Sequence, residues 1–238
     1  MHGRRAAFFD FDKTLIDCES SKLLIEYMKK NRRHFFSEKG ISVTYLIKLL
    51  ALNEFYKRDL YSDEKMALLL ISFFKGRRLS TFEDIALELY RDYIEQHLSP
   101  VLMEHVERHR KEGDLLVLIS AGLRYILSVV KTELGFDNLL CTDLETGADG
   151  LLTGRALGIL CINANKKLLC EKLAKEEGID LKSSSAYGNH QSDIPMLDAV
   201  GHAFAVEPTK PLLRFALQKG WPVLRYRVKS SSQSSPPS

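Results

Sequence analysis

The sequence predicts an α/β protein in which a parallel sheet carries helices on both faces, with a helical insertion after the first strand. Ala6–Asp12 is a short apolar run typical of a buried strand, whereas from about Glu19 to His97 apolar residues recur at helical spacing. After His97, short apolar runs alternate with helical patterns. Parallel strands need such crossover connections, so this alternation favours a parallel sheet.

The insertion is expected to contain several amphipathic helices. Two apolar stripes at helical spacing indicate them: Leu23, Leu24, Tyr27 and Met28, then Tyr45, Leu46, Leu49 and Leu50. Ser80–Glu83 has the capping-box pattern and predicts a helix that continues to Tyr93. Ser99 and Pro100 predict the cap and first turn of a further helix, which Gly113 should end.

The remaining elements complete the expected sheet. Strands are predicted at Leu115–Ile119, Leu139–Thr142, Ser184–Tyr187, Ala203–Val206 and Pro222–Tyr226, and helices at Leu123–Leu134, Asn165–Glu177, Asp193–Ala199 and Lys210–Lys219. Gly147–Gly158 carries turn residues and indicates a hairpin. We therefore expect a core at residues 1–18 plus 98–228, a helical cap at 19–97, and a disordered Ser/Pro-rich tail at 229–238.

Composition limits the function classes. The formal net charge of +3 gives no argument for a nucleic-acid partner. The four cysteines have no C-x-x-C spacing, which indicates reduced thiols in a cytoplasmic protein without a structural zinc. Neither a secretory signal pattern nor an apolar stretch long enough for a transmembrane segment is evident. The sequence carries no indication of oligomeric state.

Two carboxylates stand at the end of the first predicted strand. Residues i and i+2 of a strand point to the same side, so Asp10 and Asp12 should emerge close together. Two nearby carboxylates repel and need a cation or a shared proton, and Mg²⁺ with oxygen ligands meets that need. One carboxylate can then attack phosphorus while the other handles a proton. A turn or a helix cap is the alternative interpretation of this pair.

Three further strand or helix ends carry polar candidates. Ser120 follows a predicted strand and, with the next backbone amides, could hold phosphate oxygens, although an ordinary helix cap fits it as well. Lys166 begins a predicted helix and could reach a phosphoryl group, although such lysines are usually solvated. Asn189 and Asp193 offer oxygens to a cation, with a polar turn as the alternative.

These residues together resemble the four ordered motifs of the haloacid dehalogenase (HAD) superfamily. The motifs are Asp10-x-Asp12-x-Thr14, Ser120 after a strand, Lys166, and Asn189-x-x-x-Asp193. The insertion after the first motif resembles the C1-capped, phosphoserine phosphatase-like branch (subfamily IB). Ala186–Leu197 is close to that branch's fourth motif. The resemblance implies a Rossmann-like core with an inserted helical C1 cap domain.

The resemblance also implies a reaction. Asp10 would be the nucleophile that becomes an aspartyl-phosphate, and Asp12 the acid and then the base. Mg²⁺ would be bound by the Asp10 carboxylate, the Asp12 backbone carbonyl and Asn189, and Asp193 would support it directly or through water. Phosphate or substrate binding would fall to Thr14, Glu19, Ser120, Gly122 and Lys166. The family usually has Asp at position 189, so Asn189 predicts weaker metal binding, and Lys13 is a second departure, since small residues are common at its position.

The implied activity is that of a Mg²⁺-dependent phosphatase acting on a small phosphomonoester, like phosphoserine or histidinol phosphate. Glu19 stands where phosphoserine phosphatases have a Glu near the substrate's amino group, or it caps the following helix. The basic run 29–34 and the aromatic residues of the cap leave open membrane-surface contact and a lipid-phosphate phosphatase of the phosphatidylglycerophosphatase type. The same motifs would also fit a phosphomutase or a non-catalytic HAD-like binding protein.

Overall fold

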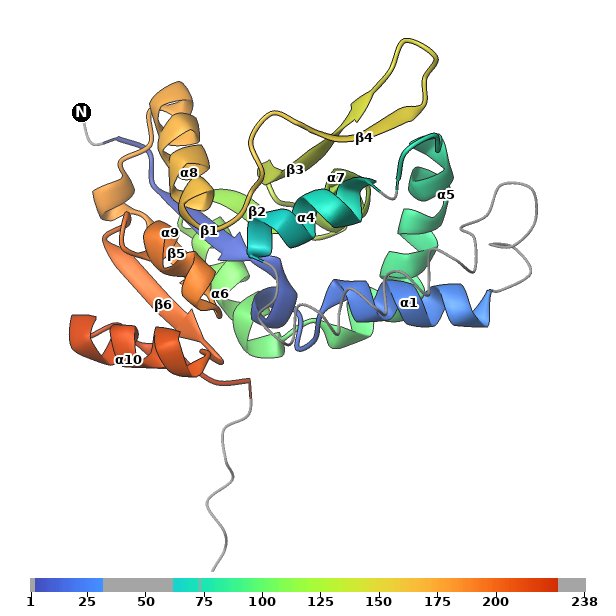
Figure 1. The fold of residues 1–238 in the computed structure, drawn as a ribbon. Helices are drawn as coiled ribbons and strands as arrows, with labels where there is room; N and C mark the ends of the chain where they lie inside the picture. Colours follow the sequence, from blue (N-terminus) through green and yellow to red (C-terminus); the bar gives the residue numbers. More distant parts are fainter. Residues whose placement is uncertain (1–2, 32–61, 73, 227–238) are drawn as a thin grey trace, which may run out of the picture.

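The computed structural model describes residues 3–31, 62–72 and 74–226. In that part of the chain a seven-stranded sheet has the order β4-β3-β2-β1-β5-β6-β7 (Figure 1), and every neighbouring pair is parallel except β3 and β4. The strands are β1 (Ala6–Asp10), β2 (Leu115–Leu123), β3 (Asn138–Thr146), β4 (Leu152–Leu157), β5 (Ser185–Gly188), β6 (His202–Val206) and β7 (Val223–Leu224). The predicted α/β class and parallel sheet are confirmed.

Helices cover both faces of the sheet because the central strand β1 is apolar on both sides. Ala7 and Phe9 belong to one core cluster and Ala6 and Phe8 to the other, as the alternation of side chains in a strand requires. The first face is covered by α6 (Pro100–Lys111) and α7 (Arg124–Glu133). The second is covered by α8 (Ala164–Glu177), α9 (Ile194–Leu197) and α10 (Lys210–Lys219).

A helical insertion lies between β1 and β2, as predicted (Figure 1). Its described elements are α1 (Ser20–Lys30), α4 (Asp63–Ser72), α5 (Ser80–Leu89), η2 (Tyr90–Ile94) and η3 (Glu95–His97). It is tied to the β3–β4 hairpin, which is the hairpin expected at 147–158: Leu152 exchanges backbone hydrogen bonds with Gly76 and Arg77. The exact division into core and cap remains a prediction.

Several expectations fall outside the described residues. These are the second apolar stripe at 45–50, part of the basic run at 32–34, the cap aromatics at 45, 55, 56, 61 and 73, and the tail at 229–238.

Two local predictions about helix starts had different outcomes. Ser99 caps α6, with its Oγ accepting a hydrogen bond from the Leu102 amide at 3.4 Å, and Gly113 ends the helix with φ +74°. The capping box at Ser80–Glu83 is wrong. Leu79 already has helical backbone angles (φ −60°, ψ −40°), so Ser80 lies inside the helix and cannot serve as its extended cap residue.

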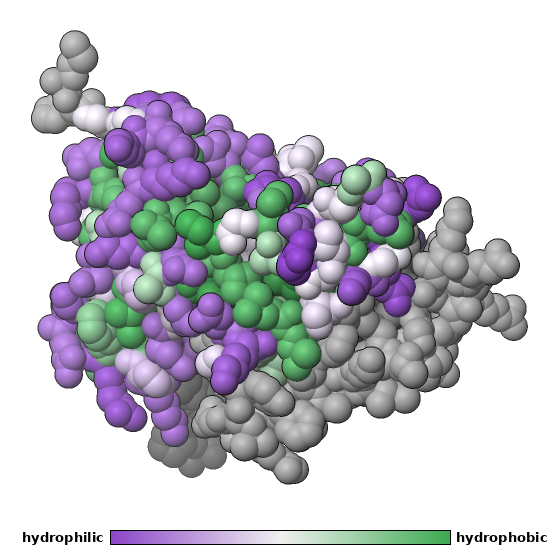
Figure 2. Space-filling view, turned by 45° about the horizontal axis from the view of Figure 1, so that its top comes forward, coloured by the Kyte–Doolittle hydropathy of each residue, from purple (hydrophilic) through white to green (hydrophobic). Residues whose placement is uncertain are grey.

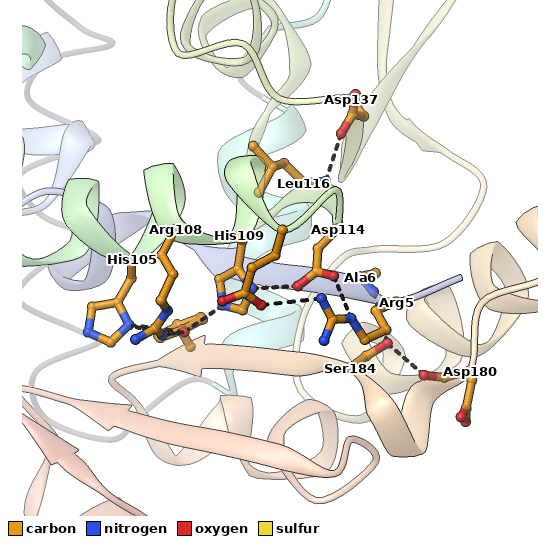
Figure 3. Close-up of polar contacts among 12 residues, drawn as sticks. Arg5, Ala6, His105, Arg108, His109, Asp114, Leu116, Asp137, Asp180 and Ser184 are labelled. Atoms are coloured by element: carbon orange, nitrogen blue, oxygen red, sulfur yellow. Dashed lines mark hydrogen bonds and ion pairs between the residues drawn. The ribbon is translucent and has the colours of Figure 1, made fainter. Parts of the chain in front are cut away.

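Side chains at the amino ends of the strands hold the sheet together (Figure 3). The Leu116 amide donates to Asp137, and the Ala6 amide donates to Ser184, whose hydroxyl donates to the Asp180 carbonyl. These groups pair backbone amides at strand starts that the sheet ladder leaves unpaired.

A second polar group joins α6 to β5 through Tyr187. Figure 3 labels its members His105, Arg108, His109 and Asp114. Tyr187 Oη lies 2.8 Å from His109 Nε2 and 3.1 Å from His105 Nδ1, and it accepts a hydrogen bond from Arg108 at 3.3 Å. His109 Nδ1 lies 2.7 Å from Asp114. The Tyr187 ring stacks between Phe9 of β1 and Phe204 of β6, with centroid distances of 4.3 and 4.7 Å. One side chain thus connects three strands and a helix.

No helix in the described ranges is long and apolar enough to cross a membrane. Figure 2 shows hydrophobic residues gathered near the middle of one face, with hydrophilic residues around them. The molecule thus has a hydrophobic area on an otherwise mostly hydrophilic face.

Tyr187→Phe is expected to lower the free energy of unfolding by about 1–3 kcal/mol, because it keeps the ring stack but leaves the buried Nε2 of His109 without this hydrogen bond. Urea unfolding of both proteins measures the difference. Equal unfolding midpoints and slopes would show that the hydroxyl contributes nothing to stability.

His105 is expected to destabilise the fold as the pH falls. Burial, then the positive charge of Arg108, lowers the pKa of His105 from 6.5 to about 4. Between pH 6.5 and 4 the unfolded chain binds a proton at His105 that the folded protein does not bind. The free energy of unfolding therefore decreases as the pH is lowered from 6.5 to 4. NMR titration of the His105 ring and unfolding of His105→Gln across this range check the prediction; a ring that titrates near 6.5 would contradict it.

Candidate active site

The candidate site lies at the carboxyl ends of the central strands, where open parallel sheets place their sites. Asp10 is the last residue of β1, and a tight turn over Phe11–Leu15 (η1) follows it. In this turn Lys13 takes a left-handed conformation, with φ 56° and ψ 16°. The turn folds Thr14 back, so that its hydroxyl donates to Asp10 Oδ2 at 2.9 Å. Asp10 is thereby fixed in orientation as well as in position.

A buried lysine joins two carboxylates at the centre of the site. Lys166, in the first turn of α8, donates to Asp10 Oδ1 at 2.7 Å and to Asp193 Oδ1 at 2.6 Å. The exposed fractions are 4% for Lys166, 5% for Asp10 and 1% for Asp193. Lys166 is therefore not the solvated surface lysine of the alternative interpretation. Its pKa is raised by the charges of Asp10 and Asp193, which outweigh its burial, so it remains an ammonium.

Burial raises the pKa of the Asp10 carboxyl to about 7. The Lys166 charge opposes this rise, whereas the charges of Asp193 and Asp12 add to it. Any additional positive charge at this point would favour the ionised, nucleophilic form of Asp10.

Asp12 lies beside this group, at the start of α1. Its Oδ1 accepts a hydrogen bond of 2.6 Å from the Ser20 amide. This amide lies at the amino terminus of α1, where backbone N–H groups have no partner within the helix. Burial raises the pKa of Asp12, and the hydrogen bond from Ser20 opposes the rise. A carboxyl with a raised pKa holds its proton more readily, which suits a general acid.

Asp193 is also held by the loop after β5. Its Oδ2 accepts from the backbone amides of Asn189 and His190, both at 3.0 Å. Gly188 must be a glycine for this, because a Cβ there would lie 2.7 Å from the Asp193 Cβ. Asn189 is 6% exposed, and its side chain makes no hydrogen bond to any other described residue.

Ser120 and Gly122 lie in an irregular section of β2. The strand runs on to Leu123, beyond its predicted end, but its register with β3 shifts between Ile119 and Leu123. Ser120 is buried, and its Oγ accepts a hydrogen bond from the Gly122 amide at 3.0 Å. The two predicted phosphate ligands are thus adjacent, and in this structure they bond to each other.

Glu19 occupies a different environment from the other predicted site residues. It forms ion pairs with Lys13 and with Lys22, the latter at 3.3 Å. Lys13 stands where the family commonly has a small residue. Its ion pair with Glu19 gives the lysine a structural role at this position. The ion pairs lower the pKa of Glu19 although its burial acts in the opposite direction.

The donor groups suit a hard divalent cation. Asp10, Asp12 and Asp193 bring three carboxylates against the single ammonium of Lys166, which leaves two negative charges in excess when all are ionised. Asn189 adds an amide oxygen in a buried position. Carboxylate and amide oxygens are the ligands that Mg²⁺ takes in proteins, so the residues present fit this ion.

A cavity of about 370 Å³ adjoins Asp12 and Lys166 of this site. Asp12, Gly122 and Lys166 line its floor, and residues of α1, α4, α7, β3 and the end of β2 line its walls. Sequence reasoning did not identify most of these wall residues. They come from segments far apart in the chain and are ordinary apolar residues, so no sequence signal marks them as lining a site.

Curated relatives of the chain include phosphatases. It is 29% identical over 234 residues to a histidinol-phosphatase of Neisseria meningitidis, covering 94% of this chain and 100% of that one. It is 28% identical over 226 residues to a phosphoserine phosphatase of Mycobacterium tuberculosis, covering 94% and 71%.

Solved structures share the fold. A protein with unknown function from Bordetella pertussis Tohama I matches with a TM-score of 0.82 at 24% identity, over 94% of this chain and 100% of that chain. A substrate-bound phosphoserine phosphatase matches with a TM-score of 0.62 at 20% identity, over 92% and 99%.

The strongest assignment comes from the family comparison. The model of the haloacid dehalogenase-like hydrolases matches residues 7–198, which include Asp10, Lys166 and Asp193. The chain therefore belongs to the haloacid dehalogenase-like hydrolase family.

Proposed function

We propose that this protein is a Mg²⁺-dependent phosphomonoesterase that works through an aspartyl-phosphate on Asp10. The observation that carries the proposal is the buried Lys166 ammonium, which bonds Asp10 and Asp193 while Asp12 lies at the floor of the same cavity. The phosphatases among the relatives support this choice of reaction within the hydrolase family.

In the first half of the reaction the Asp10 carboxylate attacks phosphorus and the bond from phosphorus to the ester oxygen breaks. Thr14 and Lys166 hold the two Asp10 oxygens, so the carboxylate needs little reorientation before attack. Asp12 donates its proton to the departing alcohol oxygen. The amide of Ser20 holds Asp12 in place for this transfer.

In the second half Asp12, now ionised, takes a proton from water, and the water attacks the acyl phosphate. This releases phosphate and restores the Asp10 carboxylate. Lys166 offsets the negative charge of the phosphoryl group. The Ser120 hydroxyl and the Gly122 amide can give up their mutual hydrogen bond and donate to the phosphoryl oxygens instead.

The Asp10 carboxylate, the Asp12 backbone carbonyl and Asn189 would hold the magnesium ion, with Asp193 in support. Bound there, the ion would offset the charge of the phosphoryl oxygens and keep Asp10 ionised. Phosphoserine and histidinol phosphate, the substrates named for two relatives, are the first compounds to test.

Asp10→Asn is expected to reduce phosphate release by at least about a thousandfold, because an amide cannot act as the nucleophile. Chelation of divalent ions should abolish wild-type turnover, and Mg²⁺ should restore it. Phosphate release from a panel of phosphomonoesters measures both. Asp17→Asn is the matched control, since Asp17 is an exposed carboxylate seven residues further along the chain. Full activity of Asp10→Asn would refute the mechanism.

Asn189→Asp is expected to lower the Mg²⁺ concentration that gives half-maximal activity by several-fold, because a carboxylate binds Mg²⁺ more strongly than an amide oxygen. Asn138→Asp adds the same charge at the start of β3, two strands away from β1, and should leave the Mg²⁺ requirement unchanged. If Asn189→Asp also leaves it unchanged, Asn189 is not a metal ligand.

A further inference from the structure

We infer that the substrate of this site is a phosphomonoester whose organic group is uncharged and apolar. The inference rests on the proposed phosphatase function and deepens it. It follows from the walls of the cavity above Asp12 and Lys166, from the charges there, and from the position of Glu19.

The cavity has a polar floor and apolar walls. Among the described residues, its apolar lining includes Leu24, Met66, Ala67, Leu70, Ile71, Phe74, Ala121, Leu123, Tyr125, Ile126 and Ile162. These residues come from α1, α4, β2, α7 and the segments after α4 and after β4, so the insertion and the core both contribute. Because Lys166 and the proposed acid Asp12 both line the cavity, the ester oxygen of a bound phosphoryl group would lie next to this apolar space.

Charged groups that could recognise a polar substrate are scarce in the described lining. Asp12 and Lys166 carry the formal charges there, and both take part in the proposed reaction. His190 is held by its own loop, with Nδ1 2.9 Å from Ser192 Oγ. The other polar lining residues are the uncharged Ser20, Ser21, Thr142 and Ser192. An ammonium or carboxylate on the substrate would thus lose its hydration without gaining a described partner of opposite charge.

Glu19 does not supply that partner. Its carboxylate does not line the cavity, and its two oxygens are each bonded to a lysine, Lys13 and Lys22. A substrate amino group would have to displace an existing ion pair to reach it. In this structure Glu19 is therefore not available to bind the amino group of an amino acid phosphate.

The size of the cavity fits the inference as well. About 370 Å³ lies at the lower end of the range for small-molecule sites, so the cavity can enclose a compact apolar group. Apolar surface buried there contributes about fourfold in affinity for each methylene. The group could belong to a free metabolite or to the chain of a membrane lipid, and the two sources share this chemistry.

The test uses the full-length wild-type protein with Mg²⁺ and Asp10→Asn as the blank. Initial rates are measured for ethyl, butyl, hexyl and octyl phosphate below their micelle concentrations, and for phosphoserine and phosphoethanolamine. We expect kcat/KM to rise by up to about fourfold per methylene until the cavity is full. The best alkyl phosphate should exceed both amino-bearing substrates by at least about tenfold.

A pair of leucine variants on α4 ties the effect to the cavity. Leu70 lines the cavity, whereas Leu68 is 44% exposed and does not line it. Leu70→Gln should flatten the dependence of kcat/KM on chain length, and Leu68→Gln, the same substitution, should keep it. The dependence is a ratio within each protein, so partial loss of folded protein does not distort it. The wild-type series also tests the inference without any variant.

Each outcome has a distinct meaning. If folded, Mg²⁺-loaded wild type releases no more phosphate than Asp10→Asn from any ester, the proposed function fails. If it hydrolyses phosphoserine or phosphoethanolamine better than every alkyl phosphate, or shows no dependence on chain length, the phosphatase function stands and this inference is overturned. Faster hydrolysis of lysophosphatidate in vesicles than of soluble octyl phosphate would assign the apolar group to a lipid, and the reverse to a free metabolite.

Discussion

The structure depends on one ammonium group placed between two buried carboxylates. Lys166 is 4% exposed, and it bonds Asp10 and Asp193 within 2.7 Å. A buried charge without its partner is strongly destabilising, typically by about 3–5 kcal/mol, so these three residues must assemble together. They come from β1, from α8 and from the loop after β5. The strand order that places β5 next to β1 is therefore what makes the ion pairs attainable.

The residues around Lys166 hold its two carboxylate partners, Asp10 and Asp193, in position. Lys13 is a non-glycine residue at positive φ, at a cost of about 1–2 kcal/mol, and the turn that it completes brings Thr14 onto Asp10. Gly188 leaves room for Asp193, whose second oxygen accepts two backbone amides. The site is therefore organised before a ligand arrives, and a cavity with many apolar lining residues adjoins it.

Much of this arrangement could be predicted from the sequence, because the relevant signals are local. Apolar runs alternating with helical patterns predicted the parallel sheet, and the D-x-D spacing placed Asp10 and Asp12 together. Lys166 was recognisable only through its order among the other motifs, since a lysine in a Lys-Lys pair is usually solvated.

Other features depend on contacts between distant segments and had no local signal. Ser80 fails as a cap because Leu79 is already helical, and β2 continues past Ser120 through an irregular register. The pairing of Glu19 with Lys13 depends on the turn conformation of Lys13. The cavity walls combine ordinary apolar residues from the insertion and the core, which only the folded chain brings together.

The central claim is that Asp10 carries the phosphoryl group during turnover. The most direct measurement is rapid acid quenching of the enzyme during hydrolysis of its best substrate, followed by mass spectrometry of the peptide that contains Asp10. The account predicts the mass increase of one phosphoryl group on Asp10, absent when substrate is omitted. Steady turnover with the phosphoryl group on a different residue, or with no phosphorylated peptide at any quench time, would contradict it.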